Sequence, residues 1–204
     1  MISLCTMLLF VGEDGESHQG VFDTAFLMSV PNLAVFAPAS FSELSSMLYV
    51  AAYKEKNAVA IRYPRGGEGY LPTDYEWDKK DFTVFGDSSA KKCIVTYGRE
   101  FSECYNALSE LDNTFVIKLN RIKPINPEVA DLVKNTEKIF FFEEGIKSGG
   151  VGECFAELLE EHGVKAEYHH TAINDEFVKQ ACVSSQIKKY HLDKESVIKT
   201  VSDC

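Results

Sequence analysis

Short runs of hydrophobic residues alternate with helical patterns through the first third of the chain. Mainly apolar stretches of strand length predict strands at residues 8–11, 33–37 and 58–63. Hydrophobic residues at helical spacing predict helices at residues 21–30 and 41–54. The first helix places Phe22, Phe26 and Val30 on one face. Ser40 and Glu43 have the spacing of a capping box at the start of the second. Strands and helices in this alternation are typical of a parallel α/β sheet.

A polar segment interrupts the pattern before a second α/β series begins. Residues 73–90 are rich in Asp and Lys and hold the only tryptophan, Trp77, so we interpret them as a linker that crosses a surface on which Trp77 docks. Further strands are predicted at residues 92–97, 115–119, 139–142 and 166–169. Further helices are predicted at residues 100–111, 128–134, 152–162 and 194–201. The chain is therefore expected to have two α/β parts, residues 1–72 and 91–204.

Composition and charge narrow the class of protein. The 204 residues are 45% hydrophobic and 25% charged, which excludes disorder as the main state. The net charge of −10 argues against a nucleic-acid partner, because such proteins need a basic face to neutralise phosphates. No apolar stretch approaches the roughly 20 residues of a membrane span. Six scattered cysteines form no C-x-x-C pair and have no histidine at metal-ligand spacing, so we expect reduced thiols, a cytoplasmic protein and no metal site.

The first candidate for chemistry is the glycine-rich segment 11–23, which follows a predicted strand and precedes a predicted helix. This position lies at the carboxyl edge of the sheet, where open α/β sheets bind ligands. Asp14, Ser17 and His18 supply a carboxylate, a hydroxyl and a proton-transfer group within five residues. On composition alone, a solvated turn is the commoner explanation of such a loop.

The second candidate is the sequence Arg-Tyr-Pro-Arg-Gly at residues 62–66, at the end of a predicted strand. Pro64 fixes its own backbone and restricts the residue before it, so both arginines are rigidly placed. Strand alternation sends Arg62 and Arg65 in different directions. One arginine can therefore bind a phosphate while the other makes a structural ion pair. Two ordinary surface arginines are the alternative.

Taken together, the two segments resemble a known family. The pattern G-E-D-G-x-[S/T]-H-Q-G-x-F-D, followed by A-I-R-Y-P-R-G, is similar to 1-deoxy-D-xylulose-5-phosphate synthases, within the transketolase-like thiamine-diphosphate enzymes. The resemblance continues through Lys-Pro-Ile-Asn at 123–126, Phe-Glu-Glu-Gly at 142–145 and Gly-Gly-Val-Gly at 149–152. We expect the glycines of the last segment to form a strand-to-helix turn, because their order does not match a phosphate-binding loop. For the remaining histidines we expect solvent-facing or capping roles.

The resemblance implies a fold and a set of roles. Residues 1–72 correspond to the last part of a thiamine-diphosphate pyrimidine-binding domain, with an incomplete parallel sheet, and residues 91–204 to a transketolase C-terminal α/β domain. It implies a thiamine-diphosphate-dependent transferase that condenses pyruvate with glyceraldehyde 3-phosphate, for isoprenoid-precursor and thiamine biosynthesis. Asp14 and His18 would be catalytic. Arg65, with Arg62 and Ser17, would bind the phosphorylated substrate.

Departures from the family pattern limit that implication. The family's Asp-Arg-Ala-Gly is replaced by Thr-Met-Leu-Leu at residues 6–9, which removes an arginine that helps to hold phosphate. The glutamate that activates the cofactor, the aromatic cradle of its ring and the motif for Mg²⁺ and diphosphate have no counterpart here. We therefore expect no complete thiamine diphosphate and Mg²⁺ site in this chain, and no turnover by the chain alone.

Three functions remain open at this stage. The chain is a C-terminal portion of the synthase, or a split subunit that is active only with a partner carrying the upstream domains, or a non-catalytic module for dimerisation or binding. An incomplete sheet exposes an edge and apolar surface, so we expect a dimer or higher oligomer formed through residues 1–70, or association with the missing N-terminal domains.

Overall fold

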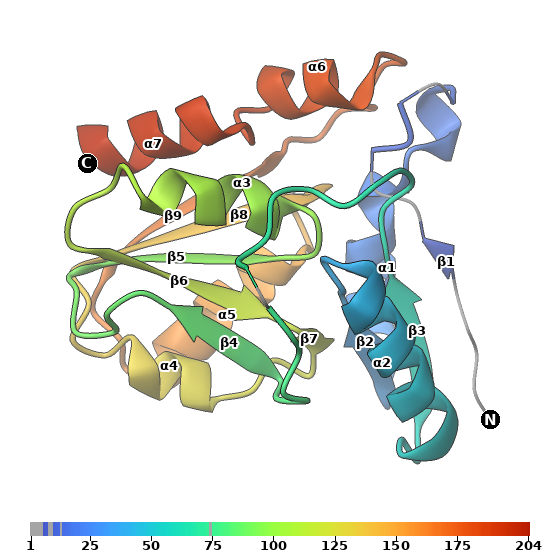
Figure 1. The fold of residues 1–204 in the computed structure, drawn as a ribbon, viewed down its shortest axis with the longest axis horizontal. Helices are drawn as coiled ribbons and strands as arrows, with labels where there is room; N and C mark the ends of the chain where they lie inside the picture. The colour runs from blue at the N-terminus through green and yellow to red at the C-terminus, as the bar shows by residue number, and fades with distance from the viewer. Residues whose placement is uncertain (1–5, 8–9, 13, 74) are drawn as a thin grey trace.

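The computed structural model describes residues 6–7, 10–12, 14–73 and 75–204, which form two β-sheets side by side (Figure 1). The first sheet has the order β1-β3-β2-β7. Its strands are β1 (Thr6–Met7), β2 (Leu33–Phe36), β3 (Ala58–Arg62) and β7 (Arg121–Lys123). β1, β3 and β2 are parallel, whereas β7 pairs antiparallel with β2. The sheet is therefore mixed, not purely parallel as expected.

Two helices follow the strands of this first sheet. They are α1 (Asp23–Ser29) and α2 (Phe41–Tyr53). The predicted cap of α2 is confirmed on one side, because the Ser40 hydroxyl accepts a hydrogen bond from the Glu43 amide at 3.0 Å. The Glu43 carboxylate instead accepts from the amide of Ala39, at 2.6 Å. In the core beneath α2, Trp77 packs edge-on against Phe36 with ring centroids 6.1 Å apart, so its predicted docking is confirmed.

The second sheet has the order β4-β6-β5-β8-β9. Its strands are β4 (Phe82–Phe85), β5 (Lys92–Tyr97), β6 (Thr114–Leu119), β8 (Lys138–Ile146) and β9 (Glu167–Ile173). All pair in parallel except β4, which runs antiparallel to β6. Alternate residues of β5 and β8 enter two separate cores, which explains why both strands read as continuous apolar runs.

Helices cover both faces of the second sheet. One core includes residues of α4 (Glu128–Leu132) and α5 (Val151–Glu161). The other includes residues of α3 (Glu100–Leu108) and α7 (Lys194–Asp203), and α6 (Val183–Lys189) packs at its margin. The expected strand-to-helix turn at the glycine-rich segment is confirmed, because β8 leads into α5 there.

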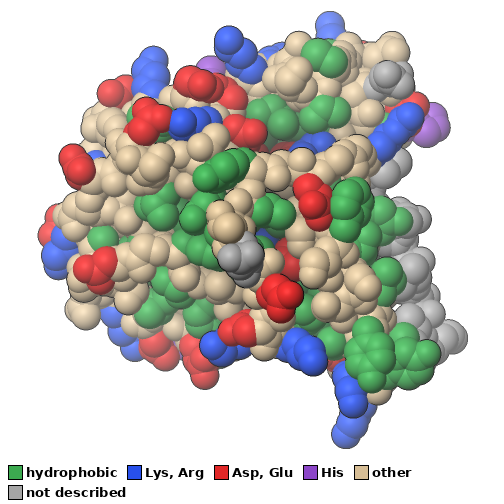
Figure 2. Space-filling view, viewed as in Figure 1, with side chains coloured by type: hydrophobic (Ala, Val, Ile, Leu, Met, Phe, Trp, Pro, Cys, Tyr) green, Lys and Arg blue, Asp and Glu red, His purple; other side chains and the backbone are tan. Residues whose placement is uncertain are grey.

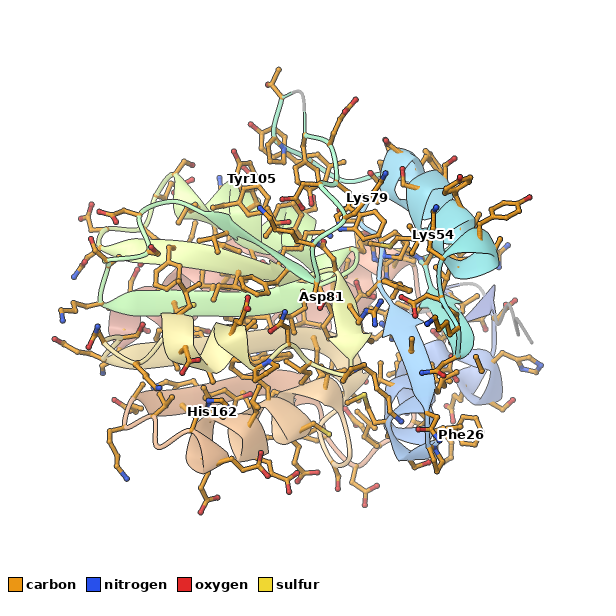
Figure 3. The ribbon with its side chains drawn as sticks, turned by 90° about the horizontal axis from the view of Figure 1, so that it is seen from below. Phe26, Lys54, Lys79, Asp81, Tyr105 and His162 are labelled. Atoms are coloured by element: carbon orange, nitrogen blue, oxygen red, sulfur yellow. The ribbon has the colours of Figure 1, made fainter. Side chains whose placement is uncertain are left out.

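After residue 23, three of the strands and α-helices were not predicted: β4, β7 and α6. β4 lies inside the expected linker 73–90, and β7 comes from the second part of the chain but pairs with β2 of the first sheet. Arg121, the first residue of β7, is paired with Glu55 and with Asp81, which lies at the junction of the two sheets (Figure 3). The two parts therefore share a sheet and a core, so the domain limits at 72 and 91 stay predictions.

Two findings bear on the predictions about membrane spans and cysteines. Within the described ranges, no helix is long and apolar enough to cross a membrane. Five cysteines are free thiols, namely Cys93, Cys104, Cys154, Cys182 and Cys204. Cys5 and residues 8 and 9 of the strand predicted at 8–11 lie outside the described residues. Phe10 and Val11 are described but are not part of a strand, so the prediction is wrong for them, and the strand that precedes this segment is β1.

Candidate functional site

The two segments singled out in the sequence meet at one edge of the first sheet. Residues 10–22, here called the site loop, follow β1, and residues 63–68 follow β3. Because β1 and β3 are parallel neighbours, both segments start from the same carboxyl edge. Asp14 Oδ2 lies 3.5 Å from Arg65 Nη1, and the two side chains remain 45% and 50% exposed. A carboxylate and a guanidinium are thus side by side and open to a ligand.

Ser17 and His18 lie on a short 3-10 helix, Glu16–His18, in the middle of the site loop. Ser17 Oγ is 3.1 Å from His18 Nδ1, and both residues are exposed. When the hydroxyl donates to Nδ1, the imidazole proton is on Nε2, where it can be given to a bound molecule. The four residues predicted for the loop and the strand end therefore form two contacts at this edge of the sheet, Asp14 with Arg65 and Ser17 with His18, and we call this set the rim.

Gln19 shapes the loop from within, a role that the sequence analysis missed. Its side chain is nearly buried, at 4% exposure. Oε1 accepts from the Val11 amide at 2.9 Å, and Nε2 donates to the Asp14 carbonyl at 2.9 Å. The position of Gln19 directly after His18 in the motif was the only available signal, and it did not distinguish packing from chemistry.

Arg62 is directed into the interior, away from Arg65, as strand alternation predicts. It is 1% exposed, and Nη2 donates to the carbonyls of Glu144 at 3.1 Å and Gly20 at 3.4 Å. Its guanidinium carbon lies 5.7 Å from the centre of the Tyr97 ring. A phosphate on the exposed rim cannot reach it without displacing these contacts. Its position therefore does not support the predicted contact with substrate, and Arg65 is the arginine at the rim.

A buried polar cluster lies behind Arg62, at the carboxyl edge of the second sheet. Glu143 Oε2 accepts from Tyr97 Oη at 2.6 Å, and Oε1 lies 2.8 Å from His170 Nε2 and 2.9 Å from the Gly152 amide. Burial, reinforced by Glu143, raises the pKa of Tyr97 well above its usual range. His170 was expected at the surface or in a cap, but its side chain is only 7% exposed, because it is held by a carboxylate that itself caps α5.

Glu144, the next residue, points the other way and pairs with Arg99. Arg99 Nε donates to Oε1 at 2.9 Å, and Nη2 donates to Oε2. Burial acts to lower the pKa of Arg99, but nearby carboxylates, Glu144 foremost, together outweigh it and the pKa is raised. The amide of Phe10, at the start of the site loop, lies 3.5 Å from Glu144 Oε2. This pair, like Gln19, has no signature in the local sequence.

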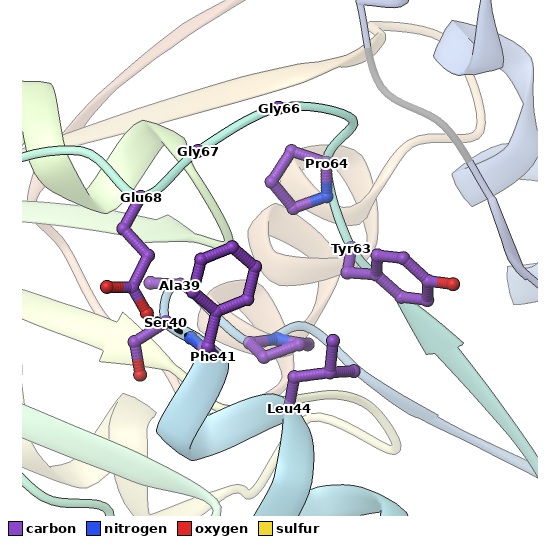
Figure 4. A pocket seen from close by; sticks show the side chains of 10 residues that line it. Ala39, Ser40, Phe41, Leu44, Tyr63, Pro64, Gly66, Gly67 and Glu68 are labelled. Atoms are coloured by element: carbon purple, nitrogen blue, oxygen red, sulfur yellow. Dashed lines mark hydrogen bonds between the residues drawn. The ribbon is translucent and has the colours of Figure 1, made fainter.

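A small pocket adjoins the rim on the side of α2 (Figure 4). Its wall is mainly apolar and includes Phe41, Leu44, Tyr63 and Pro64. At its mouth, the Glu68 carboxylate accepts a hydrogen bond from the Phe41 amide at the start of α2. The segment that carries Arg65 is therefore fixed at both ends, by β3 and by α2.

The described residues show no group of three or more His, Cys, Asp or Glu side chains that could hold a metal ion. The site consists of hydrogen-bonding and proton-transfer groups with one exposed cation. Such a set suits an anionic organic molecule and proton transfer to it.

Comparison with protein families and with curated proteins finds similarity to transketolase-like proteins in both cases. The sequence profile of the transketolase C-terminal domain matches residues 87–197, and that of the transketolase pyrimidine-binding domain matches residues 2–67. A 1-deoxy-D-xylulose-5-phosphate synthase of Caldanaerobacter subterraneus subsp. tengcongensis is 33% identical over 201 residues. The synthase of Clostridium perfringens is 35% identical over 202 residues. In both cases the match covers 94% of this chain and 32% of the relative, so the chain spans about a third of these proteins.

A solved structure with the same fold is described as a split gene transketolase, an inactive beta4 tetramer. The TM-score is 0.84 at 24% sequence identity, and the match covers 99% of this chain and 66% of that one. At this identity the likeness concerns the fold. The expected arrangement of a pyrimidine-binding-type sheet followed by a transketolase C-terminal-type domain is thereby confirmed.

Proposed function

This chain belongs to the transketolase-like family of thiamine-diphosphate-dependent enzymes, and we propose that it is the substrate-side subunit of such an enzyme. In this proposal a partner chain carries the diphosphate-binding domain, and the chain alone does not turn over substrate. The observation that carries the proposal is the pairing of Asp14 with Arg65 on an exposed rim beside Ser17 and His18. A non-catalytic module would have no need of this set.

The residues of the rim have distinct roles in the proposal. Arg65 binds the phosphate of an aldehyde substrate, because a guanidinium offers paired donors to phosphate oxygens. His18 transfers a proton to or from the substrate oxygen, with Ser17 setting its tautomer. Asp14 holds Arg65 in place and hydrogen-bonds substrate hydroxyls. Gln19 and Arg62 fix the backbone that carries these groups.

We assign the diphosphate and Mg²⁺ to the partner, because the described part of the chain holds no cluster of metal-ligating side chains. Thiamine diphosphate, when bound, supplies a nucleophilic carbon that protein side chains lack. The pair of substrates proposed first is pyruvate and glyceraldehyde 3-phosphate. It is supported by the synthase relatives at 33% and 35% identity and by the A-I-R-Y-P-R-G segment.

The test combines this chain with a chain carrying the diphosphate-binding part of a synthase relative. Thiamine diphosphate, Mg²⁺, pyruvate and glyceraldehyde 3-phosphate are added, and release of carbon dioxide is measured with and without the partner. Turnover only with both chains supports the split subunit. Loss of glyceraldehyde 3-phosphate with a ketose phosphate donor in place of pyruvate, a transfer that releases no carbon dioxide, assigns the transketolase reaction instead. No turnover in either case supports the non-catalytic module.

Within the active mixture, Arg65→Gln tests the phosphate contact. We expect the KM for glyceraldehyde 3-phosphate to rise by roughly 10- to 100-fold, since a hydrogen bond to a charged group contributes about 1.5–3 kcal/mol. The KM for pyruvate should change little. Lys54→Gln is the matched control, because Lys54 is an exposed cation at the far end of α2 (Figure 3). Equal effects of the two substitutions would contradict the role of Arg65.

A further inference from the structure

We infer that the second sheet positions the site loop, with Glu144 as the positioning residue and Arg99 as its support. The inference rests on the proposed function for its catalytic consequence, but its structural basis is separate. Glu144 makes contacts near both ends of the loop. Its carboxylate lies against the amide of Phe10, where the loop begins. Its backbone carbonyl accepts a hydrogen bond from Arg62 Nη2, and this nitrogen also donates to the carbonyl of Gly20 near the end of the loop.

Apolar contacts from the C-terminal segment support the same placement. The Phe10 ring stacks on Tyr190 with centroids 5.7 Å apart, and the Phe22 ring meets Phe177 edge-on at 5.4 Å. Between them, the Ala181 amide donates to the Gly12 carbonyl at 3.3 Å. Both ends of the loop are therefore seated on residues that come more than 100 positions later in the chain.

The charge on Glu144 makes this arrangement depend on one partner. The side chain of Glu144 is 1% exposed, and Arg99 is the cation that pairs with it among the described residues. A buried carboxylate that loses its cation is strongly unfavourable and rearranges to reach water. Rearrangement of Glu144 would release the Phe10 amide. The exposed residues 14–18 in the middle of the loop would then lose one of their anchors.

Hydrogen exchange of this chain, measured by mass spectrometry on loop peptides, tests the inference without requiring activity. Arg99→Gln should speed exchange of the Phe10 and Val11 amides about tenfold, because local opening of the loop start becomes easier. The double variant R99Q/E144Q should return to within about threefold of the parent, since a glutamine amide still accepts from Phe10 and carries no charge. Arg121→Gln is the matched control, because Arg121 also joins the two sheets but pairs with Glu55 and Asp81, away from the loop.

Two results would overturn the inference. One is unchanged exchange at Phe10 and Val11 in R99Q. The other is an equal acceleration of hydrogen exchange in the loop, in α5 and in β8, which would mean that the Arg99–Glu144 pair only stabilises the fold. Where R99Q does not fold, R99K is measured in its place, since it keeps the charge but loses the two-point contact.

In the two-chain mixture, R99Q should lower kcat about tenfold while the KM for glyceraldehyde 3-phosphate stays within about threefold, because a misplaced loop affects proton transfer more than phosphate binding. An exchange effect in a mixture that never turns over would contradict the proposed function and leave the loop contact standing. Turnover without an exchange effect would contradict the inference about Glu144 and leave the proposed function standing.

Discussion

Two glycines lie near the start of the site loop, Gly12 and Gly15, and the structure requires glycine at only one of these positions. Gly12 has φ 76°, a conformation that residues with a Cβ rarely adopt. A Cβ built there would lie 3.1 Å from Val183 Cγ2 and 3.2 Å from the Ala181 carbonyl oxygen. Gly15 has φ −66°, and a Cβ built there would meet nothing within 4 Å. Only Gly12 is required by the backbone and by its contact with the C-terminal segment.

We therefore expect Gly12→Ala to lower the free energy of unfolding by roughly 1–2 kcal/mol, the cost of a left-handed backbone for a residue with a Cβ. Gly15→Ala should stay within about 0.5 kcal/mol of the parent. Urea unfolding followed by Trp77 fluorescence measures both. Equal stabilities of the two variants would show that the turn at Gly12 is not needed.

Among the secondary-structure elements, β6 and α2 are joined by a fully buried ion pair. Lys118 Nζ lies 2.8 Å from Glu43 Oε1, which also accepts from Tyr75 Oη at 2.6 Å. Burial lowers the pKa of Lys118, and Glu43 opposes the shift. The pair and Tyr75 therefore join three parts of the chain: α2, the segment between β3 and β4, and β6 of the second sheet.

Removing one member of this pair should be costly. We expect Lys118→Met to lower the free energy of unfolding by roughly 3–5 kcal/mol, because the Glu43 carboxylate stays buried without its cation. Adding Glu43→Gln should restore part of that loss, so that the two effects are not additive. A double-mutant cycle in urea measures the coupling. Additive losses would mean that the two side chains do not interact in the folded protein.

Sequence patterns placed most helices and strands well but missed the elements that depend on distant partners. The helix at 41–53 follows from its own spacing and from the Ser40 cap. β4 and β7 have four and three residues, too few for a periodic signal, and they exist because β6 and β2 offer edges to pair with. Phe26 lies on the surface of α1, pointing outward (Figure 3), although it shares an apolar face with Phe22.

On the scale of the whole molecule, the first sheet leaves apolar surface uncovered. The outer face of α2 carries Phe41, Tyr49 and Tyr53, which are 61%, 54% and 74% exposed, and hydrophobic side chains gather at this corner of the molecule (Figure 2). The Tyr49 and Tyr53 rings are 5.0 Å apart. Exposed apolar groups of this size are common at contact surfaces, so self-association through residues 1–70 remains our prediction.

Analytical ultracentrifugation at tens of micromolar should therefore detect a dimer or a larger species. The double substitution Tyr49→Ser and Tyr53→Ser should shift the equilibrium towards monomer, because it removes the apolar area of the α2 face. Phe177→Ser, an exposed aromatic of the second part of the chain, is the control and should leave the equilibrium unchanged. A strictly monomeric parent would contradict the prediction.

The site loop, the strand that ends at Arg62 and the family resemblance were all accessible from sequence, because motifs, periodicity and caps depend on residues a few positions apart. Strand alternation predicted that Arg62 and Arg65 diverge, but not which of them turns inward; the exposed pairing of Arg65 with Asp14 and the role of Gln19 were not accessible either. Phe10 and Glu144 are 134 positions apart, and Arg62 and Glu144 are 82 apart. Which polar groups meet across such separations depends on strand register and on the packing of the two sheets, and no local pattern encodes either.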